Sequence, residues 1–210
     1  MCIRDSTDTM SYQEMAEDMH SFMEEQWLFD GAYLMGHSMG GKVAMEFALK
    51  YPDQVWKLAV IDIAPVEYEP SHQIILKSMT SLELSKMEVR REVQDHLMKS
   101  IGNRNIVAFL LKNLRRQDDT FSWKVNIHAI AHQYEKLLQA PSIKDNPVSI
   151  ESIFIKGSDS RYIEDSMQPQ IAGRFSHFRI VEIKQAGHWV HADQPSLLEY
   201  EIRLFFQSKG

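Results

Sequence analysis

The sequence is poor in cysteine, has no excess of positive charge and contains no long apolar run. Its single cysteine, Cys2, cannot form a disulfide within the chain, which suits a reducing compartment, so we expect a cytoplasmic protein. The 23 lysines and arginines are outnumbered by 29 acidic residues, and the net charge is −6. Surfaces that bind nucleic acid need clustered cations, so nucleic acid is not an expected partner.

No stretch of the chain is predicted to cross a membrane. The apolar runs at 58–61 and 107–111 are far shorter than the roughly 20 residues of a spanning helix. Residues 1–6 lack the long apolar region of a signal peptide, so none is expected. What is present is an ordinary globular composition, 44% hydrophobic and 25% charged in 210 residues, which predicts one domain with a sizeable core.

The pattern of apolar residues predicts an α/β architecture with a helical insertion. Residues 66–140 are charged and helical in pattern, without a convincing strand, and are expected to form a cap inserted within a single domain over 1–210. The remaining segments predict a mostly parallel sheet flanked by helices. Strands are expected at 32–35, 56–63, 150–155 and 178–183, and helices at 12–28, 42–50, 166–175 and 195–207.

A short glycine-rich motif connects the first expected strand to the next helix. Residues 36–40, Gly-His-Ser-Met-Gly, fit G-x-S-x-G, which presents a serine on a sharp strand-to-helix turn. The glycines leave room for the neighbouring chain at a strained backbone. This pattern predicts Ser38 as a nucleophile, with the backbone N–H of Met39 as a donor to the developing oxyanion.

A serine nucleophile requires a base, and a histidine is expected after the last strand. His188 occupies that place, directly after Gly187, while His191 is a competitor three residues on. A metal pair of these two histidines would need a third ligand, and none stands out, so neither a metal nor another cofactor is expected.

Two aspartates are candidates for the acid that orients the base. Asp62 follows the second strand, where reacting groups gather at the carboxyl ends of parallel strands. Asp159 follows the third strand, but it stands one residue before the usual position, which Ser160 occupies here. We therefore favour Asp62 and keep Asp159 as the alternative acid.

Four segments together resemble one family. The segments are Gly36–Lys42 (GHSMGGK), Ile61–Val66 (IDIAPV), Gly187–Ala192 (GHWVHA) and Phe109–Asn113 (FLLKN). They look like the bacterial YbfF-type esterases of the α/β-hydrolase superfamily, and the likeness runs from about Asp5 to the C-terminus. The resemblance implies the α/β-hydrolase fold, Asp62 as the triad acid, and hydrolysis of short acyl esters or of thioesters such as acyl-CoA.

The sequence departs from that family before Ser11. Family members begin with a strand ending in His-Gly, whose following loop donates a second oxyanion N–H, and then a second strand. Only 35 residues precede Gly36, so the expectation is an N-terminally truncated chain with a foreign start at 1–6, lacking those strands. Losing one oxyanion donor would lower the rate by roughly 10²–10³-fold.

The expected substrate is a small ester or thioester, bound by a monomer or dimer. The predicted substrate pocket comprises His37, Trp189 and three residues of the cap, Phe109, Leu110 and Trp123. The three cap residues are equally typical of an ordinary hydrophobic core. Two other activities stay open, because one fold hosts several functions: a non-catalytic ligand-binding protein, and a perhydrolase or carbon–carbon bond hydrolase with the same triad.

Overall fold

The computed structural model describes residues 9–117, 119–142 and 144–208. Cys2 and the segment 1–6 lie outside the described residues. The chain divides into two compact units, and we describe each by itself. The first holds Tyr12–Tyr68 and Gln139–Gly210, and the second includes Glu69–Leu138. These boundaries lie close to those expected for the inserted cap. Within the described part of the chain, no helix is long and apolar enough to cross a membrane.

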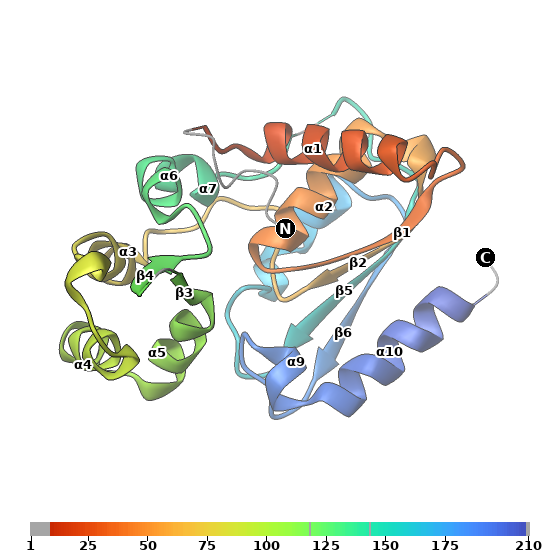
Figure 1. The fold of residues 1–210 in the computed structure, drawn as a ribbon. Helices are drawn as coiled ribbons and strands as arrows, with labels where there is room; N and C mark the ends of the chain where they lie inside the picture. The colour runs from red at the N-terminus through yellow and green to blue at the C-terminus, as the bar shows by residue number, and fades with distance from the viewer. Residues whose placement is uncertain (1–8, 118, 143, 209–210) are drawn as a thin grey trace. The chain divides into compact units, whose positions relative to one another are not determined.

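A parallel four-stranded sheet forms the centre of the first unit (Figure 1). The strand order is β1-β2-β5-β6, and all three pairings are parallel. The strands are β1 (Ala32–His37), β2 (Val55–Ile61), β5 (Glu151–Gly157) and β6 (Phe178–Ile183). His37 pairs with Ile61, and Gly157 with Ile183, so the four strands end at one edge. The segments that follow them therefore meet there.

Helices cover both faces of this sheet, as its apolar pattern requires. Alternate residues of β2 enter opposite cores: Leu58 and Val60 pack on one side, Ala59 and Ile61 on the other. The first core includes Phe47 of α2, and the second includes Phe205 of α10. Figure 1 shows α1 and α2 on one face and α10 on the other. The helices are α1 (Tyr12–Glu25), α2 (Met39–Lys50), α8 (Gln168–Ala172), α9 (Val190–Asp193) and α10 (Pro195–Gln207).

The four expected strands and most of the flanking helices are confirmed, with shifts of a few residues at their ends. The helix expected at 166–175 is wrong in extent: a 3-10 turn at Asp165–Met167 precedes α8, which spans Gln168–Ala172 only. Pro169 lies at the start of α8, the position where a proline without its N–H is tolerated. Gly173 follows the last residue of α8.

The second unit is built from short helices around its own core. Buried side chains such as Leu97, Val107 and Phe121 form that core. Its helices are α3 (Gln73–Thr80), α4 (Arg90–Ile101), α5 (Arg104–Leu110), α6 (Ile127–His132) and α7 (Tyr134–Leu138), with 3-10 turns at Leu84–Lys86 and Leu111–Asn113.

The prediction that this segment lacks strands is wrong. An antiparallel hairpin joins β3 (Leu114–Gln117) to β4 (Thr120–Trp123). Its turn places Asp119 in the left-handed region, with φ of 62°, a conformation that aspartate tolerates better than most residues. The Arg116 guanidinium lies 5.7 Å from the ring centre of Phe121, its cross-strand partner. Such pairs stabilise a sheet without the alternating apolar pattern by which strands are recognised.

Candidate active site

The turn between β1 and α2 presents Ser38 at the edge of the sheet. Ser38 has φ of 54° and ψ of −125°, a strained conformation for a residue with a side chain. Its N–H donates to the carbonyl of Ile61 on the neighbouring strand (3.0 Å). The strain is therefore held in place by the sheet, as expected for a nucleophile turn.

Close backbone approach explains two of the nearby glycines but not the third. A Cβ on Gly36 would lie 2.2 Å from the carbonyl oxygen of Gly40, and one on Gly41 would lie 2.6 Å from Ile63 Cγ2. A Cβ on Gly40 would meet no atom within 4 Å. The surroundings of Gly40, the second glycine of the motif, therefore leave space for a side chain, whereas Gly41 is a position without such space.

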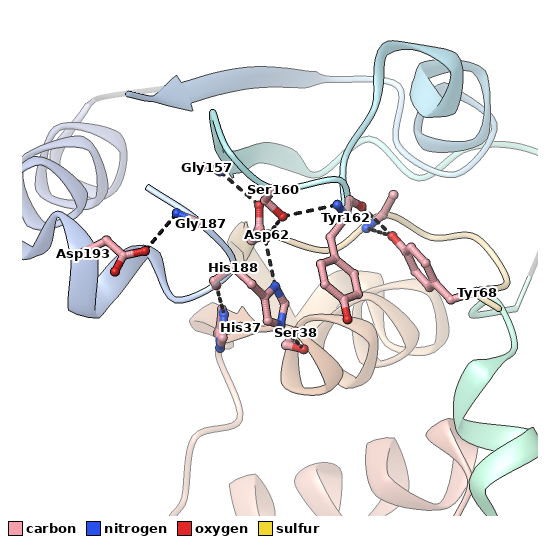
Figure 2. Close-up of polar contacts among 11 residues, drawn as sticks. His37, Ser38, Asp62, Tyr68, Gly157, Ser160, Tyr162, Gly187, His188 and Asp193 are labelled. Atoms are coloured by element: carbon pink, nitrogen blue, oxygen red, sulfur yellow. Dashed lines mark hydrogen bonds and ion pairs between the residues drawn. The ribbon is translucent and has the colours of Figure 1, made fainter. Parts of the chain in front are cut away.

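The imidazole of His188 contacts Ser38 directly. His188 Nε2 lies 2.9 Å from Ser38 Oγ (Figure 2). His188 belongs to the loop between β6 and α9, where Gly187 N–H donates to Asp193 Oδ2 (2.8 Å). His191 lies within α9, and its ring packs edge-on against His37 at 5.0 Å. The structure therefore brings His188, rather than its competitor, to the serine.

Asp62 completes the line of contacts on the far side of the imidazole. It follows β2 directly, has φ of 50° and is fully buried. Its Oδ2 lies 2.8 Å from His188 Nδ1 and accepts a hydrogen bond from Ser160 Oγ (2.5 Å). Its Oδ1 accepts from Gly157 N–H (3.0 Å). Both oxygens of this buried side chain therefore have hydrogen-bond partners, as a polar group without access to water requires.

The alternative acid, Asp159, lies in the loop that follows β5 and forms no hydrogen bond with His188 among the described residues. It is exposed, and its Oδ1 accepts a hydrogen bond from Ser158 Oγ at 2.9 Å. Ser160, one residue on, instead donates a hydrogen bond to Asp62. The position at which an acid is usual in this loop is thus occupied by Ser160, whose hydroxyl donates to the carboxylate of Asp62, the residue after β2.

The side chain of His37, a predicted pocket residue, contacts the loop of His188. Its Nε2 lies 2.7 Å from the carbonyl oxygen of His188, so this nitrogen is the donor. The two imidazoles lie 4.8 Å apart. Burial is the largest cause of a lowered pKa for His37, and the nearby rings of His188 and His191 lower it further, whereas its hydrogen bond to the His188 carbonyl opposes the shift.

Sequence reasoning missed two aromatic residues beside this line. The ring of Tyr162 stacks on His188, with ring centres 4.1 Å apart and planes at 30°. Tyr68 donates its hydroxyl hydrogen to the Tyr162 carbonyl (2.5 Å). A tyrosine two residues after Ser160 is visible in the sequence, but nothing local indicates which ring it will cover.

The other predicted site residues fall into two groups. Met39 is the first residue of α2, so its N–H has no acceptor within the helix, and Trp189 immediately precedes α9. Leu110 is buried in the core of the second unit, Trp123 packs against that core, and Phe109 is exposed. A role for these last three in an acyl pocket stays a prediction. No cluster able to hold a metal ion occurs among the described residues.

Comparison with known proteins agrees with this architecture. The sequence model of the alpha/beta hydrolase family matches residues 4–199. The sn-1-specific diacylglycerol lipase ABHD11 of Mus musculus is 33% identical over 191 residues, which are 88% of this chain and 62% of that protein. Esterase YbfF of Escherichia coli is 30% identical over 199 residues, 93% of this chain and 75% of that protein. The expected likeness to YbfF-type esterases is confirmed.

A solved structure, described as a marine microorganism esterase, superposes with a TM-score of 0.91 at 37% identity. The superposition covers 95% of this chain and 78% of that one. The expected α/β-hydrolase fold is therefore confirmed. The chain spans less than two thirds of the ABHD11 relatives, with 62% of the Mus musculus protein and 64% of that of Danio rerio covered.

Proposed function

Because the chain belongs to the alpha/beta hydrolase family, we propose that it is a carboxylic ester hydrolase. In this proposal Ser38 is the nucleophile, His188 the base and Asp62 the acid that orients it. One observation carries the proposal: an unbroken line of contacts runs from Ser38 Oγ through the His188 ring to the buried carboxylate. A serine hydroxyl is a weak nucleophile until a positioned base takes its proton.

In this proposal, the contacts of Asp62 favour one tautomer of His188. An ionised carboxylate only accepts hydrogen bonds, so His188 Nδ1 carries the proton in the 2.8 Å contact with Asp62. His188 Nε2 is then unprotonated and faces Ser38 Oγ at 2.9 Å. This is the form that can accept the serine proton, and the nearby carboxylate stabilises the imidazolium that results.

The reaction that follows has two stages. Ser38 Oγ attacks the acyl carbon while its proton moves to His188, and the Met39 N–H at the start of α2 donates to the oxyanion. His188 returns the proton to the leaving alcohol or thiol, and the acyl group remains on Ser38. Water then attacks this acyl-enzyme, giving its proton to His188, and the carboxylic acid leaves as Ser38 recovers its hydrogen.

Esters with short acyl chains are the proposed substrates, and acyl thioesters, including acyl-CoA, are the second class. The names of the relatives, a diacylglycerol lipase and an esterase, both describe hydrolysis of carboxylic esters. An ester and a thioester differ in the leaving group, whereas attack on the acyl carbon requires the same three side chains. The choice between them is a matter of relative kcat/KM.

Hydrolysis of p-nitrophenyl butyrate by the purified 210-residue chain tests the proposal. We expect turnover by the wild type, with a burst of p-nitrophenol as the acyl-enzyme forms, and its loss in Ser38→Ala. Ser100→Ala is the matched control, since this serine lies in α4 and donates only to carbonyls of its own helix. The same assay with butyryl-CoA measures the thioester preference.

Three results would contradict the proposal. One is a wild-type chain that binds acyl ligands stoichiometrically and hydrolyses none, which would favour the non-catalytic function. The second is full activity of Ser38→Ala. The third is an acyl-enzyme, trapped by rapid quenching, that carries the acyl group on a residue other than Ser38, which would leave Ser38 without its covalent role.

A further inference from the structure

The hydroxyl of Tyr68 joins two backbone segments that are far apart in the sequence. It accepts a hydrogen bond from the buried N–H of Ala64 (2.8 Å) and donates to the carbonyl of Tyr162 (2.5 Å). Ala64 follows Asp62 by two residues, and Tyr162 follows Ser160 by two. One side chain thus connects the segment that carries the acid with the loop that supports it (Figure 2).

Tyr162 carries this connection to the base. Its ring stacks on the His188 imidazole with centres 4.1 Å apart, and its N–H donates to Ser160 Oγ at 3.3 Å. The hydrogen bonds of His188 to Ser38 and Asp62 both lie at the edge of its ring. These two hydrogen bonds fix the direction in which the ring points, but they do not prevent its displacement perpendicular to its plane. The stacked ring of Tyr162 blocks that displacement on one side.

We propose that Tyr68 is a positioning residue, which acts through Tyr162 to hold the His188 imidazole between Ser38 and Asp62. The inference rests on the proposed function, because it assumes that His188 is the base. It assigns no contact with substrate to Tyr68. Its physical basis is that a base displaced by a fraction of an ångström transfers a proton far less often.

Tyr68 is itself well fixed. The Lys42 ammonium lies 4.8 Å from the centre of its ring, and the Tyr162 ring lies at 5.3 Å. Burial raises the pKa of Tyr68 above its usual range, so the hydroxyl keeps its hydrogen and remains a donor. Lys42, which lies four residues after Ser38, also donates to the carbonyl of Gln139 (2.6 Å).

This arrangement lies where the chain passes between the two units. Tyr68 is the last residue of the first unit before the second begins, and Gln139 is the first residue after it ends. Lys42, in α2, contacts both of these residues, the ring of Tyr68 and the carbonyl of Gln139. Tyr68 and the residues that contact it, Lys42, Ala64 and Tyr162, all belong to the first unit.

The substitution Tyr68→Phe removes the hydroxyl and keeps the ring. We expect kcat for p-nitrophenyl butyrate to fall about 10- to 100-fold, as for a misplaced catalytic group, while KM stays within about threefold of the wild-type value. The rate of fluorophosphonate labelling should fall by a similar factor. Tyr134→Phe is the matched control, because the Tyr134 hydroxyl also accepts from backbone N–H groups, those of Ser71 and His72 in the second unit.

A second pair of variants tests the stacked ring without touching Tyr68. Tyr162→Phe keeps the ring over His188 and should retain kcat within about threefold, whereas Tyr162→Leu should lose about tenfold or more. Rescue by phenylalanine separates positioning from a loss of folding, which thermal melting of each variant measures directly.

The outcomes separate this inference from the proposed function. If Tyr68→Phe matches Tyr134→Phe in kcat, or Tyr162→Leu matches Tyr162→Phe, the positioning role is wrong while the proposed function stands. A rise in KM with unchanged kcat would also overturn it, because that pattern reports lost substrate binding. An inactive wild type, or an active Ser38→Ala, would overturn both.

Discussion

The proposed role of the Asp62 carboxylate can be tested by replacing one of its two oxygens with an NH₂ group. Asp62 is fully buried, and its two oxygens accept from His188 Nδ1, Ser160 Oγ and Gly157 N–H. In Asp62→Asn, one of the two positions becomes an NH₂ donor. With the NH₂ towards Gly157 N–H, two donors face each other, and an unsatisfied buried group costs about 1–3 kcal/mol. With the NH₂ on the other side, it faces Ser160 Oγ and His188 Nδ1, which can both become acceptors.

The orientation of the amide that leaves no donor without an acceptor also puts His188 in the wrong tautomer. With its oxygen towards Gly157 N–H, its NH₂ faces His188 Nδ1, which must then accept a hydrogen bond. His188 Nε2 would carry the proton and could not take one from Ser38. We expect kcat to fall about 10³- to 10⁴-fold, which is about 4–5 kcal/mol in the barrier.

The assay is steady-state hydrolysis of p-nitrophenyl butyrate, with Asp159→Asn as the matched control. Asp159 lies in the neighbouring loop but is exposed, so its substitution should leave kcat within about threefold of wild type. KM should change little in both variants, since neither aspartate is assigned to the substrate. The reasoning is refuted if Asp62→Asn keeps more than about a tenth of the wild-type kcat, or if Asp159→Asn loses as much.

Two further predictions concern the turn and the helix after it. Gly36→Ala should lower the free energy of unfolding by about 1–3 kcal/mol, because its Cβ would lie 2.2 Å from the Gly40 carbonyl, whereas Gly40→Ala has open space and should not destabilise. Urea unfolding compares them, and equal midpoints would contradict the close approach of these two backbone segments. Burial lowers the pKa of Lys42 from 10.5 to about 8, so between these values the unfolded chain binds more protons and stability due to this group rises with pH. Lys42→Met should remove that rise, and a constant difference in stability between the two proteins from pH 8 to pH 10.5 would contradict it.

Much of the site could be predicted because its residues lie in local patterns. The G-x-S-x-G turn needs only five consecutive residues, and the place of His188 after the last strand indicates its proposed role, with His191 as the competitor. The acid is harder to assign, because Asp62 and Asp159 both follow strands. The structure separates them through burial and through the three donors around Asp62, which no local pattern contains.

The residues that sequence reasoning missed act over long separations. Tyr68 and Tyr162 are 94 residues apart, and Asp62 and Ser160 are 98 residues apart. Lys42 has the residue type of an exposed helix position, yet it is only 2% exposed, because both α1 and the chain near Gln139 pack against α2. The β3–β4 hairpin could not be predicted from an apolar pattern, since its first strand contains consecutive arginines, which are stabilised by their partners across the hairpin.

Covalent labelling of the nucleophile tests the central claim most directly. The purified chain is treated with a fluorophosphonate, digested, and its peptides are analysed by mass spectrometry. We predict a single phosphonylated residue, Ser38, and loss of that label in both Ser38→Ala and heat-unfolded wild-type protein, since reactivity depends on the contact with His188. Labelling at another serine, or labelling that survives Ser38→Ala, would contradict the account.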